Sequence, residues 1–127
     1  MAEGVFSKLA EGLQKALDEK GWTPTPVQQV TQDEISSGGD RLIVAPTGSG
    51  KTMAAMLPLL DRCLSEGWQG MSILYITPLR ALNRDVDRRL EEITTAVGLR
   101  LGLRHGDTTQ SERTKQVRKP PNVMITT

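Results

Sequence analysis

Residues 45–52, APTGSGKT, carry side chains suited to holding a chain of phosphates. Gly50, Lys51 and Thr52 fit the second half of the phosphate-loop pattern G-x-x-x-x-G-K-[ST], and Ala45 occupies the place of its first glycine. Glycines lack a Cβ, so successive backbone N–H groups can point at phosphate oxygens. Lys51 can reach the β and γ phosphates, and the Thr52 hydroxyl can ligate Mg²⁺. We therefore expect a nucleotide site formed by Pro46, Thr47, Gly48, Ser49, Gly50, Lys51 and Thr52. Within it, we expect Lys51 and Thr52 to act in catalysis.

A phosphate loop must be positioned by a strand before it and a helix after it. The pattern predicts strands over residues 41–45, 71–76, 99–103 and 122–127. It predicts helices over residues 5–20, 27–35, 81–97 and 109–119, and a further helix that begins in the glycine-rich turn and runs to about residue 64. Because strands and helices alternate, we expect an α/β fold with a parallel sheet flanked by helices.

Length and composition limit the class of protein. The chain has 127 residues, 37% of them hydrophobic, which suits one globular domain or part of one. The longest apolar run, residues 53–60, is too short to span a membrane, and the first residues lack the features of a secretory signal. We therefore expect a cytoplasmic protein. Cys63 is the only cysteine, so a disulfide framework is excluded, and we expect it to fill apolar space on a helix.

Charge is distributed unevenly, although the net charge is only +1. Residues 1–79 hold six Lys and Arg against nine Asp and Glu, a net −3. Residues 80–127 hold ten against six, a net +4. Residues 80–127 are therefore the better candidate for contact with a phosphate backbone, although a solvated surface of mixed charge would give the same charge distribution.

The phosphate loop alone leaves kinases, GTPases and motors open, and the flanking residues narrow the choice. Upstream TPVQ, the loop itself and downstream TPLRAL together resemble superfamily 2 helicases. The stretches ITPLRALNRDV and RHGDTTQSERTKQVRKPPNVMITT resemble the large helicase-related group of DNA helicases more closely than the DEAD-box RNA helicases. The resemblance covers nearly the whole chain. It implies that residues 1–127 are the N-terminal part of a RecA-like ATP-binding domain, truncated at its C-terminal side.

The resemblance also implies roles for individual residues. Gln28 would bind the adenine edge through its carboxamide, and Trp22 could help to shape that pocket or serve only in packing. ATP and Mg²⁺ would be the cofactors. Contacts to single-stranded nucleic acid, DNA more than RNA, would come from two short stretches: Thr77, Pro78, Leu79 and Arg80, then Thr126 and Thr127.

Other polar residues of the C-terminal part are ambiguous. Arg104 and Asp107 could contact nucleic acid or a neighbouring domain, or lie on a surface loop. His105, the only histidine, lacks partners for a metal site, so we expect a structural or surface role. The basic end of the helix at 109–119 could follow a phosphate backbone or complement its own dipole, and it carries Arg113, Lys115, Arg118 and Lys119.

The sequence differs from the helicase pattern in one important respect. The acidic motif that completes the Mg²⁺ site in these helicases would follow Thr127, and Asp33-Glu34 lies on a helix before the loop instead. A second motor domain is also expected only in the full-length protein. We therefore expect this chain alone to bind ATP with little turnover. A non-catalytic nucleotide- or nucleic-acid-binding module, a DEAD-box-type RNA helicase fragment and a small-molecule kinase remain as alternatives.

Overall fold

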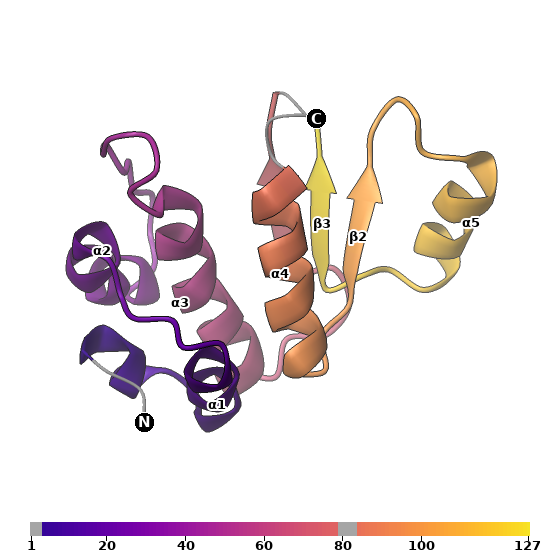
Figure 1. Ribbon diagram of the computed structural model, residues 1–127. Coiled ribbons are helices and arrows are strands. Elements are labelled where there is room, and N and C mark those ends of the chain that lie inside the picture. The colour runs from indigo at the N-terminus through magenta and orange to yellow at the C-terminus, as the bar shows by residue number, and fades with distance from the viewer. Residues whose placement is uncertain (1–3, 79–83) are drawn as a thin grey trace. The chain divides into compact units, whose positions relative to one another are not determined.

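Helices form the first part of the chain and a small parallel sheet forms the second (Figure 1). The computed structural model describes residues 4–78 and 84–127, and it divides into two units, residues 1–67 and 68–127. The first unit holds η1 (Gly4–Lys8), α1 (Glu11–Glu19), α2 (Pro26–Ser36) and α3 (Lys51–Ser65). The second holds β1 (Ile73–Ile76), α4 (Arg84–Ala96), β2 (Leu101–Arg104), α5 (Gln110–Arg118) and β3 (Val123–Thr126).

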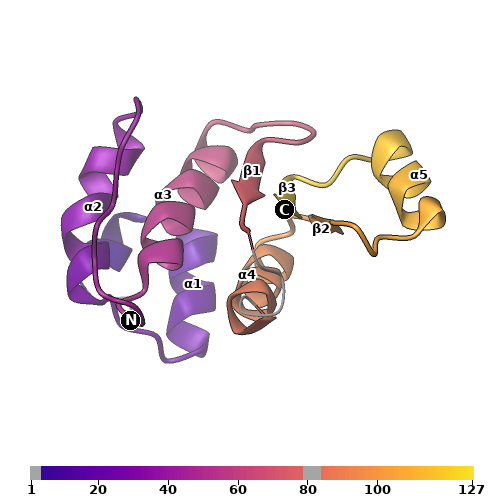
Figure 2. The same cartoon turned by 90° about the horizontal axis from the view of Figure 1, so that it is seen from above.

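The core of the first unit is built mainly by α3, which packs against α2. Figure 2 shows these two helices side by side. Burying each large apolar side chain contributes about 1.5–3 kcal/mol. Cys63 is 2% exposed and belongs to this core, as the sequence predicts. The other buried α3 residues are Met53, Ala54, Met56, Leu57, Pro58 and Leu60.

The expected continuous helix over residues 5–20 is interrupted. A 3₁₀ turn, η1, ends at Lys8, and α1 begins only at Glu11. The backbone N–H of Ala10 donates to Asp61 Oδ1 at 2.6 Å, so a carboxylate from α3 takes the place of a helical acceptor. The break therefore has a long-range cause. The expected end of the helix is confirmed, because Gly21 has φ +67° and follows its C-terminus.

The expected strand over residues 41–45 is wrong. The segment has no regular secondary structure, and the side chains of Leu42 and Val44 are 87% and 85% exposed. A strand needs a paired neighbour for its backbone hydrogen bonds. Within the described part of the first unit there are only helices and turns, so no such neighbour is available there.

The second unit is a three-stranded parallel sheet in the order β1-β3-β2. Ile76 and Arg104 both pair with Thr126, so the three strands end at the same edge. The central strand is the most buried, with Val123 fully buried. This confirms the expected α/β class with a parallel sheet.

The two helices of this unit differ in how they pack. In both overall views α4 lies against one face of the sheet, and Leu90 and Ile93 are fully buried. By contrast, α5 lies beyond β2 and has no buried residue (Figure 1). Side chains hold it in place instead, since Gln116 Nε2 donates to the Leu103 carbonyl at 2.8 Å. Among the described residues, no helix is long and apolar enough to cross a membrane.

Candidate functional site

The phosphate-loop residues form a tight turn that opens directly into α3. Gly48 and Gly50 have φ +80° and +88°, values that side chains with a Cβ disfavour. The N–H of Ser49 donates to the Pro46 carbonyl at 3.2 Å, which closes the turn. The first helical bond of α3 is donated by Ala54 to Gly50, so the N–H groups of the preceding residues lie at the positive end of the helix.

Lys51 is the first residue of α3, and its ammonium group folds over the loop. Its Nζ donates to the carbonyl of Ala45 at 2.7 Å and to the carbonyl of Pro46 at 3.3 Å. The cation therefore lies on the loop rather than in bulk solvent. Thr52 follows on the same helical turn and is half-buried, while Thr47 is exposed at the tip of the loop.

Gln28 connects α2 to the phosphate loop. Its Oε1 accepts from the N–H of Thr25 at 3.0 Å, and its Nε2 donates to the carbonyl of Gly50 at 3.2 Å. A carboxamide has two donor hydrogens and two acceptor positions, so half of this capacity is left for a ligand. A Cβ added at Gly50 would lie only 2.7 Å from Gln28 Nε2, so this close approach requires glycine.

Two buried hydroxyl groups in this region fit the presence of a polar ligand. Ser49 Oγ and Thr25 Oγ1 are buried and have no hydrogen-bond partner among the described residues. Such groups are costly unless something else satisfies them. Together with the helix N-terminus and Lys51, they suit an oxygen-rich anion. The Thr52 hydroxyl could hold a magnesium ion beside it.

The second group of predicted site residues meets at the edge where the three strands end. The N–H of Thr77 donates to the carbonyl of Thr126 at 2.9 Å, and Thr126 Oγ1 donates to the carbonyl of Arg104 at 2.6 Å. Carboxyl ends of parallel strands are the usual ligand-binding edge of an α/β sheet. Pro78 and Thr127 are exposed at this edge. The predicted contacts Leu79 and Arg80 lie outside the described residues.

A small cavity of about 20 Å³ lies at this edge, lined by the apolar side chains of Leu103 and Ile125 and by the polar residues Thr77, Asp87, His105, Thr126 and Thr127. Burial raises the pKa of the Asp87 carboxyl, and the charge of His105 opposes this shift. Oδ1 of Asp87 is buried without a partner among the described residues. His105 Nδ1 accepts from the N–H of Asp107 at 3.1 Å, which fits the structural role expected for this histidine. No cluster of three metal-ligating side chains occurs among residues 4–78 and 84–127.

The sequence does not predict the surroundings of two polar residues at these sites. Asp87 is one of several charged residues on α4, and only the fold places it against the strand ends. Thr25 belongs to the TPVQ stretch and caps α2, and only the fold shows that its side chain lies close to Gly50. The sequence-predicted residues fall into two sets, the loop in the first unit and the strand ends in the second.

The glycine loop that opens α3 and the parallel sheet with its helices define a nucleotide-binding α/β fold of the RecA type. The model of the family described as "DEAD/DEAH box helicase" matches residues 25–127. The chain therefore belongs to the DEAD/DEAH box helicase family.

Relatives that are named as helicases support this assignment. A "Lhr helicase/ probable uracil glycosylase" of Mycolicibacterium smegmatis is 40% identical over 82% of the chain and 8% of the relative. An "ATP-dependent helicase Lhr-Core protein 2" of Thermococcus barophilus is 36% identical over 98% of the chain and 16% of the relative. The solved Mycobacterium smegmatis helicase Lhr, bound to ssDNA and AMP-PNP, has a TM-score of 0.81 at 33% identity and covers 98% of the chain. The chain spans 17% of that protein's solved length, so it corresponds to a small part of each of these proteins.

Proposed function

We propose that the chain is the ATP-binding portion of the first motor domain of an ATP-dependent nucleic-acid helicase. The observation that carries the proposal is the loop at residues 46–50, which leads into α3 with Lys51 folded over it. In this proposal the backbone N–H groups of the loop cradle the phosphates. Lys51 leaves the carbonyls of Ala45 and Pro46 to pair with the β and γ phosphates.

The remaining cofactor contacts are assigned from position and chemistry. Thr52 would ligate Mg²⁺, which when bound would supply positive charge to offset that of the phosphates. Gln28 would hold the adenine edge with its spare donor and acceptor positions while its present bonds keep it against Gly50. Ser49 Oγ would gain a partner on the nucleotide.

Nucleic acid would bind at the strand ends of the second unit. Thr77 and Thr126 lie side by side there, joined through the backbone, and Pro78 and Thr127 extend the same edge. Leu79 and Arg80 are proposed as further contacts from the sequence motif alone. Single-stranded DNA is the proposed substrate because the Mycobacterium smegmatis relative was solved with ssDNA. In the longer protein, a second RecA-like domain would close over the nucleotide, so that hydrolysis could drive movement along one strand.

The test of the nucleotide site is the affinity for Mg²⁺–ATP of the unmodified chain and of Lys51→Ala. Loss of a charge-assisted contact costs about 1.5–3 kcal/mol, so the variant should bind roughly 10–100-fold more weakly. Lys15→Ala is the matched control, since it removes the same charge from an exposed position on α1. Equal affinities for the two variants would refute the role of Lys51.

The test of the nucleic-acid half is independent of ATP. Affinities for DNA and RNA oligonucleotides of the same sequence should both fall with rising salt, with DNA bound more tightly. Tighter binding of RNA would favour the alternative, an RNA helicase. A folded chain that bound neither would contradict this half of the proposal alone.

A further inference from the structure

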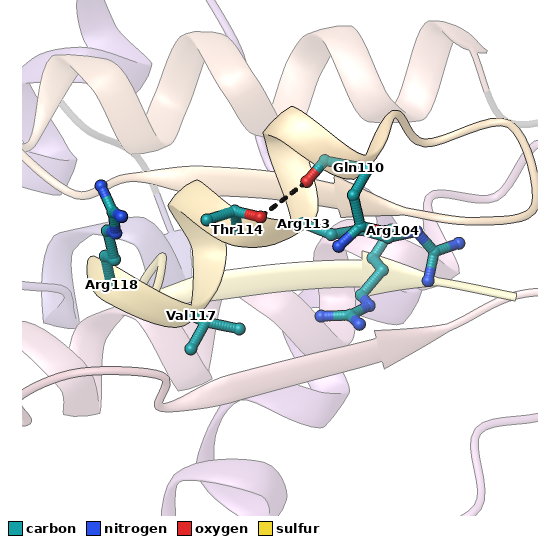
Figure 3. A pocket seen from close by; sticks show the side chains of 6 residues that line it. All are labelled: Arg104, Gln110, Arg113, Thr114, Val117 and Arg118. Atoms are coloured by element: carbon teal, nitrogen blue, oxygen red, sulfur yellow. Dashed lines mark hydrogen bonds between the residues drawn. The ribbon is translucent and has the colours of Figure 1, made fainter.

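The outer side of α5 carries a pocket of about 350 Å³ that the proposed nucleotide and strand-end sites do not use. Figure 3 shows it from close by. Three of its lining residues are arginines and none is acidic; the lining consists of Arg104, Gln110, Arg113, Thr114, Val117 and Arg118. In the part of the chain that the structure describes, no carboxylate forms an ion pair with any of these three guanidinium groups. The pocket therefore carries positive charge that no ion pair within the described part of the chain neutralises.

The arginines are held at different points around the helix. Arg113 is fixed, because its Nη2 donates to the carbonyl of His105 at 2.9 Å and its Nε donates to the carbonyl of Thr108 at 3.2 Å. Arg104 comes from the end of β2, and Figure 3 shows it near the Gln110 end of α5. Arg118 lies at the opposite end of the helix. The charges therefore extend along α5.

The acidic residue of α5 is turned elsewhere. Glu112 pairs with Lys115 at 3.6 Å, and both of these side chains line a different pocket, on the side toward Arg100 and Pro121, which shares only Arg118 with the arginine pocket. Val117, in contrast, is 72% exposed in the arginine pocket and offers an apolar surface between the cations. A guanidinium group matches a phosphate with two parallel hydrogen bonds, and an apolar side chain suits a sugar.

The pocket is continuous with the strand-end edge through Arg104. The carbonyl of Arg104 accepts from Thr126 Oγ1, and Thr126 is one of the proposed nucleic-acid contacts. From Arg113 to Arg118 the helix rises ~7.5 Å, so the two guanidinium groups are far enough apart to contact different phosphates of one strand.

We propose that this pocket binds the phosphate backbone of a nucleic-acid strand and extends the contact from the strand ends across Arg104 to Arg113 and Arg118. The inference rests on the proposed nucleic-acid binding, and it adds a contact surface on α5. It predicts affinity without base preference, since only phosphate and sugar are contacted.

The experiment measures binding of the whole chain to a fluorescent oligodeoxythymidine of about twenty nucleotides by anisotropy, between 50 and 200 mM salt. Arg118→Gln removes one cation, and Val117→Glu places a carboxylate in the pocket without removing any cation. Lys115→Gln is the matched control, because it removes one charge from the same helix outside the pocket. Circular dichroism checks that α5 is retained in each variant.

Loss of one phosphate contact should lower the slope of log affinity against log salt by about 0.7 and weaken binding roughly eight-fold at 50 mM salt. We expect this for Arg118→Gln, a comparable loss for Val117→Glu, and less than a two-fold change for Lys115→Gln. The same measurements with polyglutamate test an acidic protein partner.

Three results would overturn the inference. If both pocket variants behave like Lys115→Gln, the pocket does not contact the strand, while the strand-end proposal stands. If the pocket variants lose polyglutamate binding but keep oligonucleotide binding, the surface is for an acidic protein. If the unmodified chain does not bind the oligonucleotide at 50 mM salt, this inference and the nucleic-acid half of the proposed function both fail.

Discussion

Replacing Gly50 by alanine tests the contact between α2 and the phosphate loop. Gly50 has φ +88°, and a side chain in this left-handed region costs about 1–2 kcal/mol. The added Cβ would also lie 2.7 Å from Gln28 Nε2 and 3.2 Å from Thr25 Oγ1. Moving Gln28 away breaks its bond to the Gly50 carbonyl, worth about 1 kcal/mol. Gly50→Ala should therefore lower the free energy of unfolding by about 2–3 kcal/mol.

Gly48→Ala is the matched control, because its φ is +80° and a Cβ there has no atom within 4 Å. Only the backbone cost of about 1–2 kcal/mol should appear. The two variants should therefore differ by about 1 kcal/mol, the contribution of the Gln28 contact.

The assay is urea unfolding followed by the fluorescence of Trp22, which belongs to the first unit. A Trp68→Phe background removes the other tryptophan, so that the signal reports this unit alone. Equal destabilisation by Gly50→Ala and Gly48→Ala would refute the reasoning, since Gln28 would then not be held against the loop.

Three further changes probe the two units separately. Asp61→Ala leaves the N–H of Ala10 without its acceptor. The free energy of unfolding of the first unit, measured by Trp22 fluorescence, should therefore fall by about 1–3 kcal/mol. An unchanged free energy of unfolding would show that this bond does not cause the break before α1. Asp87→Asn tests the raised pKa of this carboxyl. Because burial favours the protonated form, its contribution to stability is lost as pH rises through the folded-state pKa. The variant should therefore melt at a higher temperature than the unmodified chain at pH 7, and the difference between the two melting temperatures should shrink in acid. A variant that melts lower at pH 7 would contradict burial as the dominant cause. Leu90→Ala empties a fully buried position on α4 and should destabilise the second unit by about 2–5 kcal/mol by circular dichroism, whereas Leu103→Ala, at a 41% exposed position, should cost less.

Local patterns in the sequence predict most of the second unit. The helix α5 follows from its capping residues, since Thr109 Oγ1 accepts from the N–H of Glu112 at 3.2 Å. The strand β3 forms where the sequence predicts a strand, because β1 and β2 pair with it on both sides. These features need information from only a few neighbouring residues, or from strands that the same unit supplies.

The errors have long-range causes. Residues 41–45 have the composition of a strand, but composition does not say whether a partner strand is available. The break before α1 depends on Asp61, which is 51 residues from Ala10. At the site, the motif predicts the phosphate-loop residues, but the bond between Gln28 and Gly50 and the burial of Asp87 follow only from packing.

The most direct test of the central claim is the chemical-shift change of each backbone amide when Mg²⁺–ATP is added to the ¹⁵N-labelled chain. If the loop cradles the phosphates, the N–H groups of residues 48–52 should shift most, and inorganic pyrophosphate should reproduce much of the effect. If those amides stay unchanged in a folded sample while ATP shifts others, or none, the phosphate-loop account is wrong.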